Sequence, residues 1–335
     1  MSRSIALRVA ALAGFASVWL WFSPAQSAQA PAAGAWFKGN LHTHTINSDG
    51  DSSPDEVVRW YKEHRYNFLV LTDHNYLTSV SGLNSVLGAD GQFIVVRGEE
   101  VTDRFEDKPI HVNAFNPKSL IRPQGGTSVL DTIQRNVDAI RHAEAVPSIN
   151  HPNFGWAITA DDLRRVQNDK LFEVYNGHPQ VNNLGGGGSP GLEQVWDMVL
   201  SGGRTMYGIA VDDAHNFKQF SPSLSNPGRG WVAVRAAELS TAALAEAIER
   251  GDFYASTGVV LDDVERLPNG IKVQIRQSRP FKYTVEFIGE NSRVLKSTFE
   301  NPSTYTLARS DRYVRAKITA SSGEVAWTQP VLRSP

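Results

Sequence analysis

The strongest constraint on the fold of this chain is a repeated alternation of short apolar segments with helical segments between residues 36 and 258. The apolar runs typical of β-strands are Trp36–Thr43, Asn67–Thr72, Phe93–Arg97, His111–Phe115, Val146–Asn150, Leu171–Tyr175, Thr205–Val211 and Val232–Val234. Helical patterns occupy residues 54–66, 127–145, 161–167, 192–200 and 241–250. This alternation predicts an α/β domain over residues 35–258 with a parallel sheet, and the strand count favours a distorted (β/α)7 barrel of the TIM type.

The pattern changes after residue 258. Ile271–Ile275, Tyr283–Phe287 and Tyr313–Ile318 alternate apolar and polar residues with a period of two. Such alternation is typical of antiparallel strands that bury one face. The sequence therefore predicts a second, small antiparallel β-sandwich domain over residues 259–335.

The first residues have the order of a secretory signal peptide. Arg3 and Arg8 are followed by an apolar run over residues 9–22, and small residues follow Ser23 and Pro24. The run is shorter than the ~20 residues of a membrane-spanning helix. We predict a signal peptide over residues 1–28, with an uncleaved N-terminal anchor as the alternative. The mature protein is then periplasmic or secreted and has no stable membrane span.

Composition limits the partners and the chemistry. The 33 basic and 35 acidic residues leave a net charge of −2, which gives no electrostatic basis for binding a nucleic acid polymer. The chain has no cysteine, which excludes disulfides, thiolate metal sites and cysteine nucleophiles. Any metal must therefore be held by histidine, aspartate or glutamate, and nine histidines are present.

Candidate metal ligands stand at or just beyond the ends of successive predicted strands. Six of the nine histidines and several carboxylates do so: His42, His44, Asp49, Asp73, His74, Glu99, Glu100, His111, His151, Asp212, Asp213 and His215. Residues i and i+2 of an extended segment share one face, so His42 and His44 can reach the same metal. Active sites of (β/α) barrels are built at this rim. The pattern predicts a metal centre there.

The ordered motif HxH, D, TDH, GxE, H, HP and DxH resembles the polymerase and histidinol phosphatase (PHP) superfamily of metallohydrolases, over residues 42–215. The resemblance implies a centre of two to three divalent ions of Zn, Mn or Fe. Its implied ligands are His42, His44, Asp49, His74, Glu100, His111, His151, Asp213 and His215. Glu99 and Asp212 adjoin two of these carboxylates, and strand alternation lets only one member of each pair face the metals.

The resemblance implies a hydrolase that uses water activated by the metals to cleave a phosphoester of a small molecule. Residues 251–258 and the β-rich tail also resemble an exported, carbaryl-hydrolase-like branch, which makes hydrolysis of a carboxyl or carbamate ester a second hypothesis. A third hypothesis is a metal- or carbohydrate-binding protein without catalysis.

Further residues are assigned roles within this interpretation. Glu100, Asp213 and Asp73 are the candidate catalytic carboxylates, and Asp73 would act by orienting a ligand, with a strand-end cap as its alternative role. Asn176 and His178 follow the strand 171–175, where Glu173 also lies, and are candidates for substrate binding. Arg229 is a candidate for binding an anionic substrate.

Overall fold

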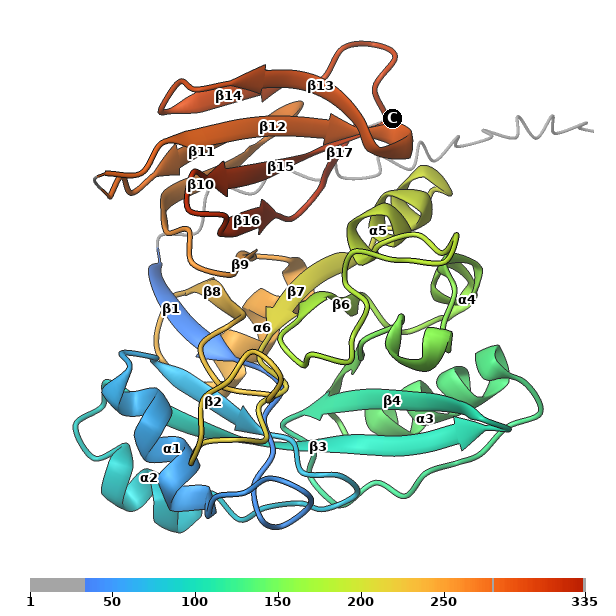
Figure 1. Cartoon of the computed structure of the whole chain (residues 1–335), viewed down its shortest axis with the longest axis vertical. Coiled ribbons are helices and arrows are strands. Elements are labelled where there is room, and N and C mark those ends of the chain that lie inside the picture. The colour runs from blue at the N-terminus through green and yellow to red at the C-terminus, as the bar shows by residue number, and fades with distance from the viewer. Residues whose placement is uncertain (1–33, 279, 334–335) are drawn as a thin grey trace, which may run out of the picture. The chain divides into compact units, whose positions relative to one another are not determined.

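The computed structural model describes residues 34–278 and 280–333, and it shows a mixed α/β protein with one large sheet and a separate three-stranded antiparallel sheet (Figure 1). The predicted signal peptide lies outside the described residues. The helices are α1 (Pro54–Glu63), α2 (Ser81–Leu87), α3 (Val129–His142), α4 (Ala160–Arg165), α5 (Leu192–Ser201) and α6 (Thr241–Arg250), with single 3-10 turns η1 (Phe154–Trp156) and η2 (Glu290–Ser292). Within this part of the chain, no helix has the length and apolarity needed to cross a membrane.

The strands of the first part follow the predicted apolar runs. They are β1 (Ala35–Asn40), β2 (Phe68–Leu71), β3 (Ile94–Phe105), β4 (Lys108–Phe115), β5 (Val146–Ile149), β6 (Leu171–Asn176), β7 (Tyr207–Val211), β8 (Trp231–Ala236) and β9 (Phe253–Ser256). β1, β2 and β3 pair in parallel, and so do β5, β6 and β7. β1 to β8 begin and end within a few residues of their predictions except β3, which is much longer, whereas no strand was predicted at β9.

The long β3 is where the structure departs from the predicted parallel alternation. No helix separates β3 from β4 here; they form an antiparallel hairpin in which Phe105 pairs with Lys108, and β4 is also antiparallel to β5 (Figure 1). The hairpin turns at Glu106, whose φ of 54° is left-handed. Since β4 runs in the opposite direction, its first residues lie at the same rim as the last residues of the parallel strands. His111 reaches the rim in this way.

The ends of β1 and β7 meet at that rim. Thr43 and Ala214 form a parallel bridge, and the amide of His44 donates to the carbonyl of Ala214 at 2.9 Å. The amide of Asp213 donates to the carbonyl of His42 at 3.0 Å. These bonds place the residues that follow the first and last strands of the β1–β7 series side by side.

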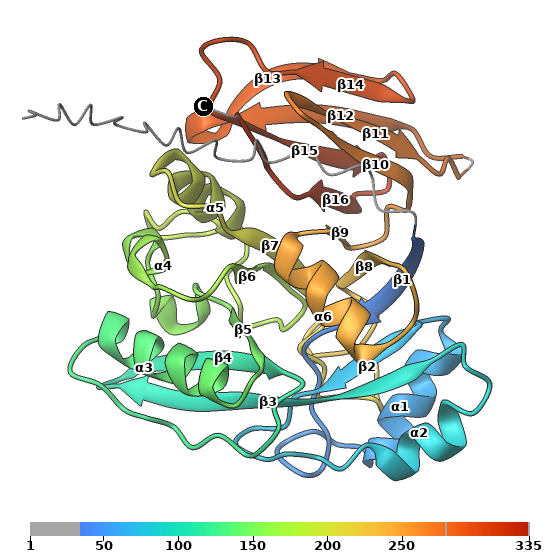
Figure 2. The ribbon, with the colours of Figure 1, turned by 180° about the vertical axis from the view of Figure 1, so that it is seen from behind.

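Apolar side chains from β1–β7 and α6 form the core beneath the rim. Phe68, Val96 and Ile209 pack with Leu244 and Ile248 of α6, and all five are buried. Figure 2 shows α6 against these strands. This packing supports the strand ends from below and leaves the rim to polar residues.

The C-terminal part contains the three predicted antiparallel strands. Its strands are β10 (Leu261–Leu267), β11 (Gly270–Ile275), β12 (Tyr283–Gly289), β13 (Arg293–Thr298), β14 (Ser303–Thr306), β15 (Tyr313–Ala320), β16 (Val325–Thr328) and β17 (Val331–Leu332). β10, β11 and β14 form the separate sheet, whose Val273 shares a core with Phe287 and Ile318 of the large sheet. β16 pairs with β9, so the large sheet continues across the domain boundary predicted at residue 258.

A buried ion pair joins α5 to β15 in the C-terminal part of the large sheet. Arg315 on β15 donates from Nε and Nη2 to the two carboxylate oxygens of Asp197, both at 2.7 Å, and each side chain is only 1% exposed. Tyr313 and Ser292 donate further hydrogen bonds to Asp197. Replacing one partner of such a pair with a neutral residue leaves the other charge buried and uncompensated.

We therefore expect Arg315→Met to lower the free energy of unfolding by about 3–5 kcal/mol, measured by chemical denaturation. The matched control is Arg165→Met, because Arg165 is 61% exposed and pairs with Asp161 at 3.5 Å on the surface. This control should cost less than about 1 kcal/mol. Equal effects of the two substitutions would contradict a stabilising role for the buried pair.

Candidate metal centre

The nine predicted ligands converge at the rim of the β1–β7 strands. They fall into four overlapping groups whose donor atoms lie within 4.8 Å of one another: His44, Asp49, His74 and His215; His42, His151 and Asp213; His42, His44 and Glu100; and His74, Glu100 and His111. The ligands come from six separate chain segments. Glu100 and His111 lie within the β3–β4 hairpin, whereas the other ligands follow the ends of strands, and the sheet brings all of them together.

Glu100 lies at the centre of the cluster. Its two carboxylate oxygens lie 2.9–3.5 Å from a nitrogen of each of five imidazoles, those of His42, His44, His74, His111 and His151. The side chain is 1% exposed. A carboxylate with both oxygens surrounded by metal-binding groups is placed to bridge two cations.

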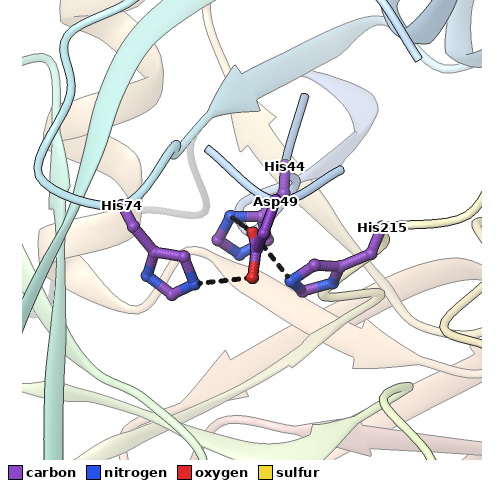
Figure 3. Close-up of side chains that lie close together, drawn as sticks. All are labelled: His44, Asp49, His74 and His215. Carbon is purple, nitrogen blue, oxygen red and sulfur yellow. Dashed lines mark ion pairs between the residues drawn. The ribbon is translucent and has the colours of Figure 1, made fainter. Parts of the chain in front are cut away.

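Asp213 and Asp49 occupy opposite sides of the cluster. Asp213 Oδ1 lies 3.2 Å from Nε2 of both His42 and His44, deep in the site. Asp49 is 55% exposed, and its oxygens lie 3.3 Å from His215 Nε2 and 3.5 Å from His74 Nε2 (Figure 3). The cluster is therefore closed on the Asp213 side and open on the Asp49 side.

The neighbouring carboxylates Glu99 and Asp212 point away from the cluster, as strand alternation requires. Glu99 accepts a hydrogen bond from the amide of Ile121 at 2.9 Å, and burial raises its pKa to about 7. Asp212 accepts bonds from Tyr61 and from the amides of Arg229 and Gly230. Glu100 and Asp213 are thus the members of each pair that reach the imidazoles.

Buried polar side chains hold the ligands in place. Glu173 lies 2.6 Å from Nδ1 of His42, which leaves His42 Nε2 to face the cluster, and it also accepts the amide of His151 at 2.7 Å. Asn176 donates to Glu173 at 2.8 Å and to Asp213 at 3.1 Å. Asn176 therefore supports two carboxylates of the site, and it also lines the same cavity as His178 and Arg229, so its substrate-binding role stays a prediction.

Asn150 was not anticipated as a site residue. Its amide donates to Glu100 Oε1 at 2.8 Å and is fully buried. The available signal was its position directly before His151 at the end of β5.

Asp73 acts on the loop that carries the ligands and does not contact an imidazole directly. It accepts hydrogen bonds from the amide and hydroxyl of Thr45, from Ser48 at 3.0 Å and from Thr78 at 2.6 Å. Ser48 in turn lies 3.3 Å from His44 Nδ1. Asp73 is therefore a positioning residue.

His178 and Arg229 lie beside the cluster, not in it. Both line a cavity of about 730 Å³, which we call the lateral cavity. The Arg229 guanidinium donates to the carbonyls of Gly177 and Ser221 and to Asn226, so part of its hydrogen-bonding capacity holds the surrounding loops. It forms no ion pair with a carboxylate among residues 34–278 and 280–333.

The electrostatics of the cluster fit cation binding. Burial alone would lower the pKa of His74, but Glu100 and Asp49 raise it to about 10. Burial opposes ionisation of Glu100, yet His42, His111 and His74 hold its pKa well below the usual value. In the described part of the chain, the buried atoms Glu100 Oε2 and His111 Nδ1 have no hydrogen bond. Protons or metal cations must therefore neutralise these carboxylates, and mixed imidazole and carboxylate donors suit Zn, Mn or Fe.

The chain is similar in structure to a two-domain protein of Bacteroides vulgatus that contains a predicted PHP-like metal-dependent phosphoesterase. The match has a TM-score of 0.52 and 14% identity, and it covers 89% of this chain and 96% of the other. The fold is PHP-like. No protein-family model matches the sequence, and no curated protein matches it significantly.

Two further solved structures resemble parts of this chain. A protein of Bifidobacterium adolescentis described as a metal-dependent phosphoesterase has 13% identity and a TM-score of 0.40, covering 56% of this chain and 89% of its own. An amidohydrolase of Chromobacterium violaceum has 15% identity and a TM-score of 0.36, covering 56% of this chain and 93% of its own.

Replacing Glu100 with Gln is expected to lower the metal content of the purified protein by at least one ion per chain, because a neutral amide cannot balance two cations. Elemental analysis after dialysis against trace Mn or Zn measures this content. Glu99→Gln is the matched control, since Glu99 faces away from the cluster and should leave the metal content unchanged. The reverse pattern would make Glu99 the bridging residue.

Glu173→Gln should weaken metal binding by about 10–100-fold, because it disturbs the carboxylate that orients His42 and the His151 backbone. Competition with a chromogenic chelator would measure the affinity. The control is Glu238→Gln, which changes an exposed carboxylate outside the site. Unchanged affinity in the Glu173 variant would show that the His42 ring is held by other contacts.

Proposed function

We propose that the chain is an exported, PHP-type metal-dependent hydrolase that cleaves a phosphoester, in particular a phosphomonoester, of a small molecule. The observation that carries the proposal is the convergence of six imidazoles and three carboxylates around Glu100, in the order of the PHP motif. The PHP-like fold supports the same conclusion. We also propose a domain boundary at residue 258, a barrel of seven strands in the first domain, and kinship with the carbaryl-hydrolase-like branch.

The four overlapping donor groups support a centre of two to three divalent ions of Zn, Mn or Fe, which the nine ligands named above would hold. Such ions supply Lewis-acid polarisation of the ester and lower the pKa of water towards neutrality. Mg prefers a shell of oxygen ligands, so it fits this imidazole-rich set poorly.

The protein's own residues then have distinct tasks. Glu100 and Asp213 supply the negative charge that holds the ions together, and Asn176 keeps Asp213 in place. Asp73 holds the loop of residues 45–48 next to His44. The open side at Asp49 admits the substrate, with Arg229 in the lateral cavity as the nearest candidate for an anionic group.

Hydrolysis of a carboxyl or carbamate ester at the same site is the second candidate. It is favoured by the apolar members of the lateral cavity, which include Val181, Phe220 and several prolines. A binding protein without catalysis is disfavoured because no ligand position of the motif is missing.

Treatment with EDTA is expected to abolish hydrolysis, and added Mn or Zn should restore it while Mg alone does not. The assay compares p-nitrophenyl phosphate with 1-naphthyl N-methylcarbamate on the full mature chain. Turnover of the phosphate and not of the carbamate supports the phosphoesterase, and the opposite result supports the second candidate. Full activity of the metal-free protein would refute both.

The proposed export is tested separately. N-terminal analysis of the protein isolated from cells should find a chain that begins near residue 29 and is recovered outside the cytoplasm. An intact residue 1 would contradict cleavage of the signal peptide.

A further inference from the structure

Two side chains that are not candidate ligands form a wall beside the metal cluster. The ring of Phe154 lies 5.2 Å from that of His151 and 6.3 Å from that of His111. The ring of His178 lies 5.5 Å from that of His215 and 6.3 Å from that of Phe154. These two rings therefore lie next to three of the candidate ligands, His111, His151 and His215.

The hydrogen bonds of His178 determine which ring nitrogen carries the proton. The amide of Gln180 donates to His178 Nδ1 at 3.2 Å, so Nδ1 is an acceptor and the proton is on Nε2. The backbone amide of His178 donates to Asn176 at 2.8 Å, which fixes the start of the loop. Within the described residues Nε2 makes no hydrogen bond. His178 therefore presents one free N–H in the half-buried region next to His215.

The lateral cavity extends from His178 away from the cluster. Its volume of about 730 Å³ is in the range of sites for small organic molecules. Phe220 lines it with a ring that is 59% exposed and stacked 6.5 Å from Trp60. Val181 and three prolines add apolar surface. Arg229, Ser221 and three asparagines give the rest of the lining polar side chains, and no carboxylate is among the lining residues. Exposed aromatic surface in a cavity favours binding of an apolar ring.

We propose that the leaving alcohol of the substrate carries an apolar ring that occupies the lateral cavity against Phe220. His178 donates a hydrogen bond from Nε2 to the oxygen that links this alcohol to the reacting group. The inference rests on the proposed hydrolase function and adds to it the class of leaving group and the residue that contacts it. This hydrogen bond stabilises the transition state, because negative charge grows on the linking oxygen as the ester bond breaks.

The first test uses two phosphomonoesters that differ in the leaving group, phenyl phosphate and p-nitrophenyl phosphate, on the metal-loaded full chain. Glutamine places its N–H near the position of Nε2, whereas asparagine places it near Nδ1. We expect His178→Asn to lower kcat about 100-fold on phenyl phosphate and less than about tenfold on p-nitrophenyl phosphate, whose oxygen needs little assistance. His178→Gln should recover most of the loss.

His142→Gln is the matched control, because His142 is exposed on α3, outside the site. Metal content and thermal stability of every variant are measured alongside. Equal losses on the two esters, or no recovery with glutamine, would overturn the role of His178, since a purely structural role makes no distinction between leaving groups.

The second test does not depend on turnover. Calorimetry of the metal-loaded protein should show phenylphosphonate binding about tenfold more tightly than methylphosphonate. Phe220→Ser should remove this preference, and Phe299→Ser, a substitution at an 80% exposed ring on the C-terminal part, should retain it. Equal affinities for the two phosphonates in the unmodified protein would overturn the cavity assignment. Failure of turnover on both esters with the phenyl preference intact would overturn the proposed phosphoesterase and leave the cavity assignment supported.

Discussion

The packing of five imidazoles around the Glu100 carboxylate is the constraint on which the rest of the site depends. A buried carboxylate and a group of buried imidazoles are each unfavourable alone, because both lose hydration. Together they balance only when positive charge is supplied, by protons or by metal cations. The surrounding bonds of Glu173, Asn176 and Asn150 then serve to keep these groups from separating.

Because these groups must be held together, strands and loops from many parts of the chain contribute residues to the same rim. The bridge between Thr43 and Ala214 joins the segments that carry His42, His44, Asp213 and His215, and the β3–β4 hairpin brings His111 beside Thr102. The apolar layer below, including α6, packs against the strands that carry the rim. The C-terminal sheet is held to α5 by the buried Arg315–Asp197 pair and does not supply any of the nine ligands.

The two sides of the cluster differ in a way that bears on substrate access. The deep side, at Asp213 and His42, is buried and filled by hydrogen-bonded carboxylates and amides. The outer side, at Asp49, is half exposed, and the ring of His178 lies beside its ligand His215. Under the proposed function, a substrate that enters from the outer side would meet the free N–H of His178 and the lateral cavity, which are placed to recognise the group that leaves.

The sequence by itself determined most strand and helix positions and twelve candidate ligands, because strand ends and periodicity are local properties; the resemblance to the PHP superfamily then reduced the twelve to nine. It could not predict the β3–β4 hairpin, since an apolar run does not reveal the direction of its neighbour, nor the pairing of β16 with β9 across the predicted boundary. Tertiary structure also decided that Glu100 and Asp213 face the cluster, that Asn176 and Asp73 support ligands, and that His178 has a free nitrogen. These outcomes depend on contacts between segments far apart in the chain, whose geometry only the folded protein defines.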